Sequence, residues 1–379
     1  MRKLDWEGIE DLLLGCAVLA TGGGGRLESG LALARACWER WGPVTLVDPD
    51  ELAEEDLVVS PYFVGAVAPA GKEEREGAAL DSYEPLLAAR ALERFLGRPV
   101  AAVVATELGG GNTAAALAVA RMMDRPLVDA DPAGRAVPEL FHSTFYLDGV
   151  PIAPFALASA IGDLAIVERV GDDFRAEAIA RAFAVASGDR AGVADHPVTG
   201  RVARRALLCG TLSRAQEVGA ALRVAREAGA DPALAAARAG GGMVIFRGTV
   251  AEDSTFSIAG GLTHGEVKVA GRGSYRGRTV EIAFRNEHMV ARMDGAVVAT
   301  IPDLISLLEE GHGTPVLNPA IPAGLEVAVV VFPAPGKWRT ARGLEVFGPR
   351  YLGLDEEYVP VEKRCRLLGL GEVDGYVRL

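Results

Sequence analysis

The run from Pro99 to Asn112 most constrains how this chain can fold. Residues 99–105 form an apolar, Val-rich segment that is too short for a buried helix, and it leads directly into Glu107 and three glycines. The residues from Thr113 to Met123 are Ala-rich and helix-forming, with Asn112 as the expected N-cap. The pattern predicts a buried parallel strand, a glycine loop and a helix.

The glycine loop is a candidate ligand site. Open α/β sheets bind ligands at the carboxyl ends of their strands, and Gly109, Gly110 and Gly111 would offer backbone N–H groups at a helix N-terminus to an anionic or carbonyl oxygen. Glu107 supplies a carboxylate beside them. The alternative is a purely structural turn, because glycine motifs alone are weak signals.

A second glycine turn follows a predicted amphipathic helix from Asp5 to Ala20. It consists of Gly22, Gly23, Gly24 and Gly25, and a further helix is expected over residues 27–41. Four glycines carry a large entropic cost, which favours close backbone approach to a ligand or to another loop. Because the preceding element is helical, the pattern does not match a dinucleotide fingerprint, and neither a nicotinamide nor a flavin cofactor is indicated.

The order of predicted elements indicates an α/β protein with two domains. Strands alternate with helices in the first half, which is typical of a parallel sheet covered on both faces, a three-layer domain. A loop over 65–71, a helix over 73–95 and a hairpin over 144–153 are expected there. Helical sequence over 199–229 leads to a mainly β, barrel-like part with a helix over 302–309. We place the boundary at 165, with domains 1–165 and 166–379.

Carboxylates follow the predicted strand Leu127-Val128. Asp129 and Asp131 lie two residues apart on an extended stretch and would point the same way, as a metal pair or an acid/base pair requires. Arg135 and Glu139 come shortly after, and all four are expected on the sheet edge that carries Glu107. The alternative is a turn at Asp131-Pro132 with Arg135 paired to a neighbouring carboxylate.

A polar cluster interrupts the β-rich half at 284–288. Asn286, Glu287 and His288 offer an amide, a carboxylate and an imidazole, and a polar hairpin turn is the alternative. The five histidines show no zinc spacing, so a divalent metal such as zinc would need ligands from distant loops. Its ligands are unknown at this point.

Composition narrows the possible partners. A net charge of −12 argues against nucleic acid, because no excess of Lys or Arg is present to displace counterions. The start shows no signal peptide, and no apolar window is long enough to cross a membrane. We therefore expect a soluble cytoplasmic protein that binds a small cyclic molecule, with a homo-oligomer left open.

Several motifs together resemble one family along nearly the whole chain. They are Thr21–Gly25, Glu107–Asn112, Asp129–Glu139, Asn286-Glu287, residues 302–305 and Phe347–Arg350. In this order they look like the S-methyl-thiohydantoin desulfurase family, whose genes often lie beside hydantoinase and oxoprolinase genes. The resemblance implies an N-terminal α/β domain, a C-terminal domain of β-barrel character, and hydrolysis of a methylated thiohydantoin to a hydantoin and methanethiol.

From position and chemistry, we expect a carboxylate among Asp129, Asp131, Glu139 and Glu107 to activate water. The two glycine turns, Asn112 and Arg135 would bind the substrate, and Asn286 and Glu287 would close the site from the β domain. Two other functions stay open. One is a non-catalytic metabolite-binding subunit of a hydantoinase or oxoprolinase system, and the other is a phosphate or nucleotide binder.

Overall fold

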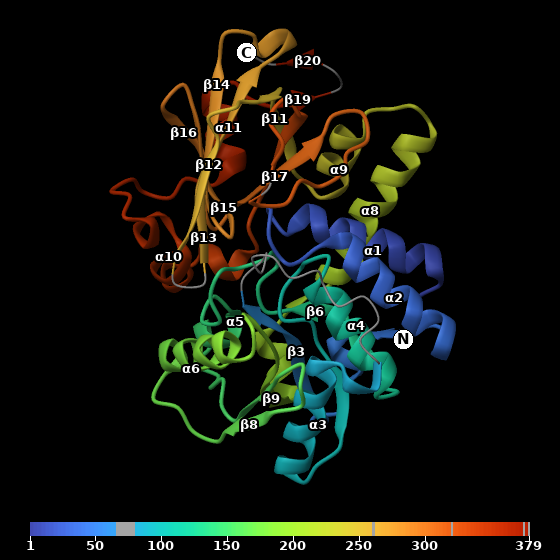
Figure 1. The fold of residues 1–379 in the computed structure, drawn as a ribbon. Helices are drawn as coiled ribbons and strands as arrows, with labels where there is room; N and C mark the ends of the chain where they lie inside the picture. The colour runs from blue at the N-terminus through green and yellow to red at the C-terminus, as the bar shows by residue number, and fades with distance from the viewer. Residues whose placement is uncertain (66–79, 260–261, 320, 374–375, 378–379) are drawn as a thin grey trace. The chain divides into compact units, whose positions relative to one another are not determined.

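The computed structural model describes residues 1–65, 80–259, 262–319, 321–373 and 376–377 (Figure 1). They form two compact units. Unit 1 consists of Met1–Ile9, Gly25–Ala133 and Glu139–Leu212, and unit 2 of Glu10–Gly24, Gly134–Pro138 and Ser213–Leu379. Residues 166–212 thus belong to unit 1, and the segments Glu10–Gly24 and Gly134–Pro138 belong to unit 2. The domain boundary expected at residue 165 stays a prediction.

Unit 1 is built on one mixed sheet with four parallel strands at its centre. The strand order is β1 (Arg2–Lys3), β2 (Thr45–Val47), β5 (Leu127–Val128), β4 (Val100–Val103), β3 (Leu57–Gly65), β9 (Arg190–Thr199), β7 (Phe155–Ala158) and β8 (Leu164–Val167). Pairing is parallel from β2 to β3 and antiparallel at both ends. The predicted strand before the glycine loop is β4, and it is buried as expected.

Helices cover both faces of this sheet. Their bounds are α2 (Leu27–Trp41), α3 (Glu84–Leu96), α4 (Asn112–Met122), α5 (Thr144–Leu147), α6 (Asp173–Ala186) and α7 (Gly200–Ala206). Tyr62 and Val64 of β3 pack against α6, whereas Phe63 contacts Tyr83 at the start of α3. Figure 1 accordingly shows α6 on one side of β3 and β9, with α3 and α4 on the other. The three-layer α/β prediction is confirmed.

Unit 2 contains an antiparallel sheet that curls on itself. The strand order is β16 (Ala296–Thr300), β15 (Glu287–Met293), β14 (Thr279–Arg285), β13 (Leu262–Gly271), β11 (Met243–Val250), β18 (Glu326–Phe332) and β17 (Leu304–Glu309), with β12 (Thr255–Ala259) paired to β13. His288 Nδ1 of β15 lies 2.9 Å from Ile305 O of β17, so the β15–β16 side of the sheet meets the β17 side. The β-rich, barrel-like prediction for the C-terminal half agrees with this curl.

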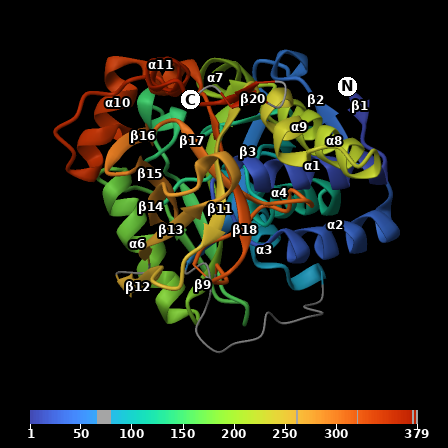
Figure 2. The same cartoon turned by 90° about the horizontal axis from the view of Figure 1, so that it is seen from above.

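The helices of unit 2 include one from the N-terminus. They are α1 (Trp6–Leu19), α8 (Thr211–Glu227), α9 (Pro232–Ala239), α10 (Ala341–Phe347) and α11 (Val361–Leu368). A Cβ added at Gly15 would lie 1.7 Å from Ala215 O, so α1 and α8 cross at backbone contact (Figure 2). Asp11 and Arg223 form a two-bond ion pair beside this crossing. The glycine allows an approach that no larger residue could.

Two sequence predictions give the wrong type of secondary structure. The expected hairpin over 144–153 is the short helix α5 and a turn, because the Ser143 side chain caps the N–H of Tyr146. The expected helix over 302–309 is strand β17, which pairs with β18 along its whole length. The predicted loop at 65–71 and the start of the helix at 73 fall mostly outside the described residues. No helix in the described part of the chain is long and apolar enough to cross a membrane.

Candidate functional site

The first glycine turn packs against its own unit. Gly22 has φ +89°, and an added Cβ there would lie 2.8 Å from His288 Cε1. A Cβ at Gly23 would lie 2.0 Å from Glu287 Oε1, and the Gly23 N–H donates to Ala20 O at 3.1 Å. Close backbone approach is therefore confirmed for Gly22 and Gly23, and it is made to strand β15. Ligand binding by Gly22–Gly25 stays a prediction.

Arg135 lies fully buried in unit 2 with all its N–H groups engaged. Its Nε donates to Ala136 O, and its two Nη atoms donate to Thr21 Oγ1 and to three backbone carbonyls, those of His288, Pro302 and Asp303, at 2.8–3.4 Å. A guanidinium has five N–H donors, and all five have a partner here. Substrate binding by Arg135 stays a prediction, and it would require one of these bonds to break.

The polar cluster at 284–288 is the tight turn between β14 and β15. Asn286 has φ +58°, and its side-chain oxygen accepts a hydrogen bond from Thr263 N at 2.8 Å. His288 Nδ1 lies 2.9 Å from Ile305 O. Burial lowers the pKa of His288 to about 4, so this imidazole is neutral at pH 7. The hairpin interpretation is confirmed, and the substrate contacts of Asn286 and Glu287 stay predictions.

The second glycine loop packs against helix α2 in unit 1. A Cβ at Gly110 would lie 2.7 Å from Leu27 Cα, and the Gly109 N–H donates to Thr113 Oγ1 at 3.0 Å. Asn112 is the first residue of α4, and Gly111 is the N-cap, so Asn112 is not the cap that we expected. Its side chain instead links Phe63 N to Glu107 Oε1. This loop thus joins β3, α2 and α4.

The predicted carboxylates after β5 differ in exposure. Asp129 is half-buried, whereas Asp131 is fully buried in the short strand β6 (Ala130–Asp131), which pairs with β10 (Leu208–Cys209). Asp131 Oδ2 accepts the N–H of Ala133 at 2.8 Å, which is the turn that we considered as the alternative. Catalytic roles for both residues stay predictions.

Glu139 lies beside other ionisable groups in unit 1. Its Oε2 is 3.8 Å from His142 Nδ1, and its charge helps to raise the pKa of Glu177 in α6. Burial is the largest cause of that raised pKa, and Arg181 opposes it. Glu177 in turn accepts the N–H of Leu140 at 2.7 Å. Glu139 therefore borders a cluster of buried acids that the sequence did not reveal.

A further group of buried polar residues in unit 1 is centred on Asp195 and His196, on strand β9. Val58 pairs with Val198 and Ser60 pairs with Asp195, so two residues of β9 stand opposite Val59. This bulge includes His196, which has φ +41°, a region that few residues other than glycine adopt. Bulges commonly re-aim side chains next to active sites.

Asp195 lies next to two polar side chains of unit 1. The Tyr62 hydroxyl donates to Asp195 Oδ2 at 2.7 Å, and His196 Nδ1 lies 3.1 Å from Asp195 Oδ1. Asp195 and His196 are only 2% and 3% exposed, and Phe145 stacks on the imidazole at 4.4 Å. Burial, followed by Asp195, raises the pKa of Tyr62 well above its usual value, so the phenol stays a donor. Glu107 adds to that shift, which puts this predicted residue near the cluster.

The other imidazole nitrogen is available for chemistry. None of the described residues hydrogen-bonds to His196 Nε2, although this atom is buried. Asp173, at the start of α6, faces the same histidine, and burial raises the pKa of its carboxyl. Among the described residues Asp195 Oδ1 has no hydrogen-bond partner, so it lies near Nδ1 without bonding to it. A histidine with a carboxylate close to one nitrogen and the other nitrogen open is a candidate general base. We call Tyr62, Asp173, Asp195 and His196 the β9 cluster.

Sequence reasoning missed the β9 cluster, although one signal was present. Residues 191–198 form an apolar strand interrupted by Asp-His-Pro, and a proline within a strand marks an edge or a bulge. A polar pair at such a bulge is a candidate site. The histidine was set aside because no partner for it was visible at metal-ligand spacing.

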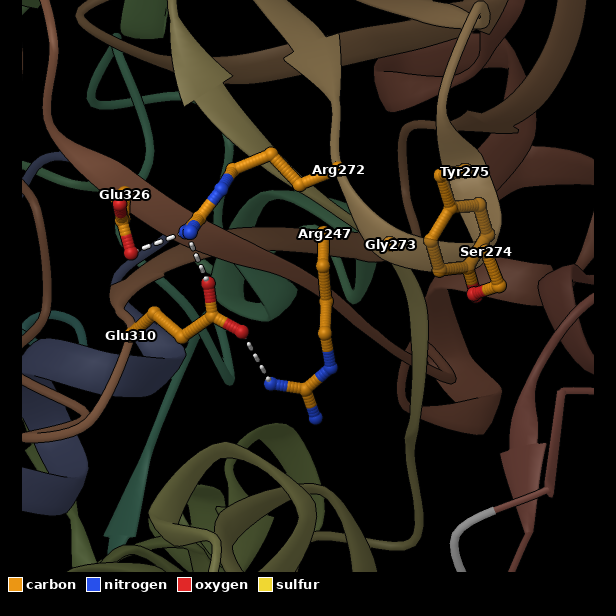
Figure 3. A pocket seen from close by; sticks show the side chains of 7 residues that line it. All are labelled: Arg247, Arg272, Gly273, Ser274, Tyr275, Glu310 and Glu326. Atoms are coloured by element: carbon orange, nitrogen blue, oxygen red, sulfur yellow. Dashed lines mark hydrogen bonds and ion pairs between the residues drawn. The ribbon is translucent and has the colours of Figure 1, made fainter.

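Unit 2 has a polar cavity of about 300 Å³ at one end of its sheet. Arg272 bridges Glu326 and Glu310, and Arg247 reaches the same Glu310 (Figure 3). Arg247 also pairs with Asp231. Because these charged side chains form ion pairs with one another, they are poorly suited to bind a charged ligand in this cavity.

Metal binding was left open by the sequence. Within the described ranges, no group of three or more His, Cys, Asp or Glu side chains is arranged to hold a metal ion. A divalent metal therefore stays a prediction without assigned ligands.

Known proteins place the chain in a family. Models of the N-terminal and C-terminal domains of the S-Me-THD-like family match residues 7–169 and 171–361. The fold is similar to the crystal structure of a protein from Chromobacterium violaceum, with a TM-score of 0.76 and 26% identity over 95% of this chain and 100% of that one. No curated protein matches the chain. The matches to both domains show that the chain belongs to the S-Me-THD-like family.

Proposed function

We propose that the protein is a hydrolase that removes the methylthio group from an S-methylated thiohydantoin ring, giving a hydantoin and methanethiol. Membership of the S-Me-THD-like family supports the substrate class. The observation that carries the proposal is the Asp195–His196 pair, with its buried Nε2 that no described residue contacts.

His196 would act as the general base. Its Nε2 takes a proton from water as the water oxygen bonds to the ring carbon that carries sulfur. Asp195 Oδ1, 3.1 Å from Nδ1, would accept a hydrogen bond from Nδ1 during the reaction and stabilise the imidazolium that forms, as the carboxylate does in other carboxylate–histidine pairs. The C=N electron pair of the ring moves to nitrogen as water adds and returns as the carbon–sulfur bond breaks. Methanethiol leaves with a proton from a general acid, and the proton on the added oxygen moves to the ring nitrogen, so the ring gains a carbonyl. The Tyr62 hydroxyl, bound to Asp195, fixes the orientation of that carboxylate.

The geometry supports His196 over the carboxylates that the sequence suggested. Asp131 Oδ2 accepts a backbone N–H and Glu107 Oε1 accepts the Asn112 amide, so both carboxylates already have structural partners. Asp129, Asp131, Glu107 and Glu139 stay predicted catalytic residues, and the same assay tests them.

The test is His196→Gln, which keeps a polar side chain but cannot take the proton. We expect kcat for methanethiol release to fall by about 10²-fold or more, because general base catalysis contributes that much. His312→Gln is the matched control, since His312 is exposed and only its backbone oxygen has a partner, Arg226. It should leave kcat unchanged.

Parallel assays with EDTA or added zinc test the metal dependence. Equal rates for His196→Gln and His312→Gln would remove His196 from the mechanism. Wild-type protein that releases no thiol from any S-methyl-thiohydantoin, with or without metal, would overturn the hydrolase proposal and favour the accessory-subunit alternative.

A further inference from the structure

We propose that Asp173 is the general acid of this reaction, which protonates the departing sulfur while His196 serves as the base. The inference rests on the proposed function and adds a second catalytic residue to the same site.

Position is the first argument. Asp173 is the first residue of α6 and only 7% exposed. A carboxylate at a helix start usually caps the helix, but here Asp172 does so by accepting the N–H of Arg175 at 2.8 Å. None of the described residues hydrogen-bonds to Asp173 Oδ2, which is buried. Asp173 therefore does not cap its own helix, and its Oδ2 is left open.

Its relation to His196 is the second argument. Ile152 accepts the backbone N–H of His196 at 3.3 Å, and the Ile152 N–H binds the Asp173 carboxylate. Ile152 therefore binds both the backbone of His196 and the carboxylate of Asp173. Two buried side chains with open polar atoms, Asp173 Oδ2 and His196 Nε2, are thus fixed to the same short segment.

The surroundings of Asp173 favour its protonated form, which is the form that a general acid needs. Burial, with the negative charges of Asp195 and Asp172, raises the pKa of Asp173, and His196 opposes the shift. Asp195 instead accepts the Tyr62 hydroxyl. A carboxyl group whose surroundings favour its protonated form is suited to act as a general acid.

The proton balance closes. Water gives one proton to His196 as its oxygen bonds to the ring carbon, and the C=N electron pair moves to the ring nitrogen. That pair re-forms C=N as the carbon–sulfur bond breaks, and the sulfur takes the bond electrons and the proton of Asp173, so methanethiol leaves. The proton on the added oxygen moves to the ring nitrogen, which gives the hydantoin carbonyl. His196 is left protonated and Asp173 ionised, and transfer of one proton between them restores the starting state.

Leaving-group dependence tests the role. An alkyl thiolate is a poor leaving group that needs an acid, whereas a 4-nitrophenyl thiolate is stable without a proton. For Asp173→Asn we expect kcat/KM to fall by about 10²-fold or more with the S-methyl ring. With the S-(4-nitrophenyl) form of the same ring, the loss should stay within about threefold. Asp50→Asn is the matched control, because Asp50 is an exposed aspartate of the short helix Pro49–Glu51, and it should change both substrates little and equally.

A purely structural role would lower activity on both substrates alike, and that result would overturn the inference. If Asp173→Asn does not fold, Asp173→Ser replaces it, and a steeper dependence of rate on thiol basicity than in the wild type is expected. An equal dependence would also overturn the inference. Wild-type protein that acts on neither ring would instead refute the proposed function, so the two failures are distinguishable.

Discussion

Replacing Arg135 by methionine separates a structural role from a substrate-binding one. The guanidinium is fully buried and donates to Thr21, to Ala136 and to the backbone carbonyls of His288, Pro302 and Asp303. Methionine matches the length of the side chain but has no donor. The acceptors would stay buried without their partner.

The magnitude follows from these bonds. Four of the five distances are 2.8–3.0 Å, and hydrogen bonds to a charged group contribute about 1.5–3 kcal/mol each. Their sum is an upper limit, because burying the guanidinium has its own desolvation cost. We expect a loss of roughly 3–5 kcal/mol in the free energy of unfolding, as for removal of one partner of a buried ionic group.

Urea unfolding and steady-state kinetics together provide the assay. The control is Arg278→Met, which removes an exposed arginine of the same unit that is paired to Asp294 and should cost about 1 kcal/mol or less. Arg135→Lys should be destabilised too, with KM unchanged in the folded fraction. A stable Arg135→Lys protein with a raised KM would refute the structural reasoning and support the sequence prediction.

Three further predictions concern stability. Burial raises the pKa of Asp173, so the ionised carboxylate lowers the stability of the protein as the pH rises through that pKa. Asp173→Asn should therefore raise the melting temperature at pH 7, and this gain in melting temperature should vanish below about pH 4. His288 has its pKa lowered to about 4, so wild-type stability should fall by roughly 3 kcal/mol between about pH 6.5 and 4, and calorimetry should find a smaller fall in His288→Asn. Gly110→Ala should lose about 1–3 kcal/mol because its Cβ would meet Leu27, whereas Gly171→Ala, with open space around it, should lose little in thermal melts.

The sequence alone determined the elements whose signals are local. Helices over 6–19 and 27–41, strand β4 and, in the C-terminal half, strands β11, β13–β16 and β18 follow from periodicity and composition within each segment. The family also followed from the sequence, because its motifs occur in order along the chain. A tight, glycine-tipped turn was correctly expected at Gly22 and Gly23, because glycine adopts a positive φ and allows close backbone approach where other residues cannot.

Elements and side-chain clusters that depend on residues distant in the sequence were decided only by the tertiary structure. Residues 304–309 are Leu-rich and suit a helix, but they form β17 because β18 pairs with them, while Ile305 and Leu307 join the core and Ser306 bonds Val18 O. Tertiary pairing overrides propensity in such segments. Tyr62 and Asp195 are 133 residues apart, and their hydrogen bond exists only because β3 and β9 are neighbours in the sheet. The β9 cluster therefore could not be read from spacing along the chain, since its geometry comes from strand pairing and a bulge.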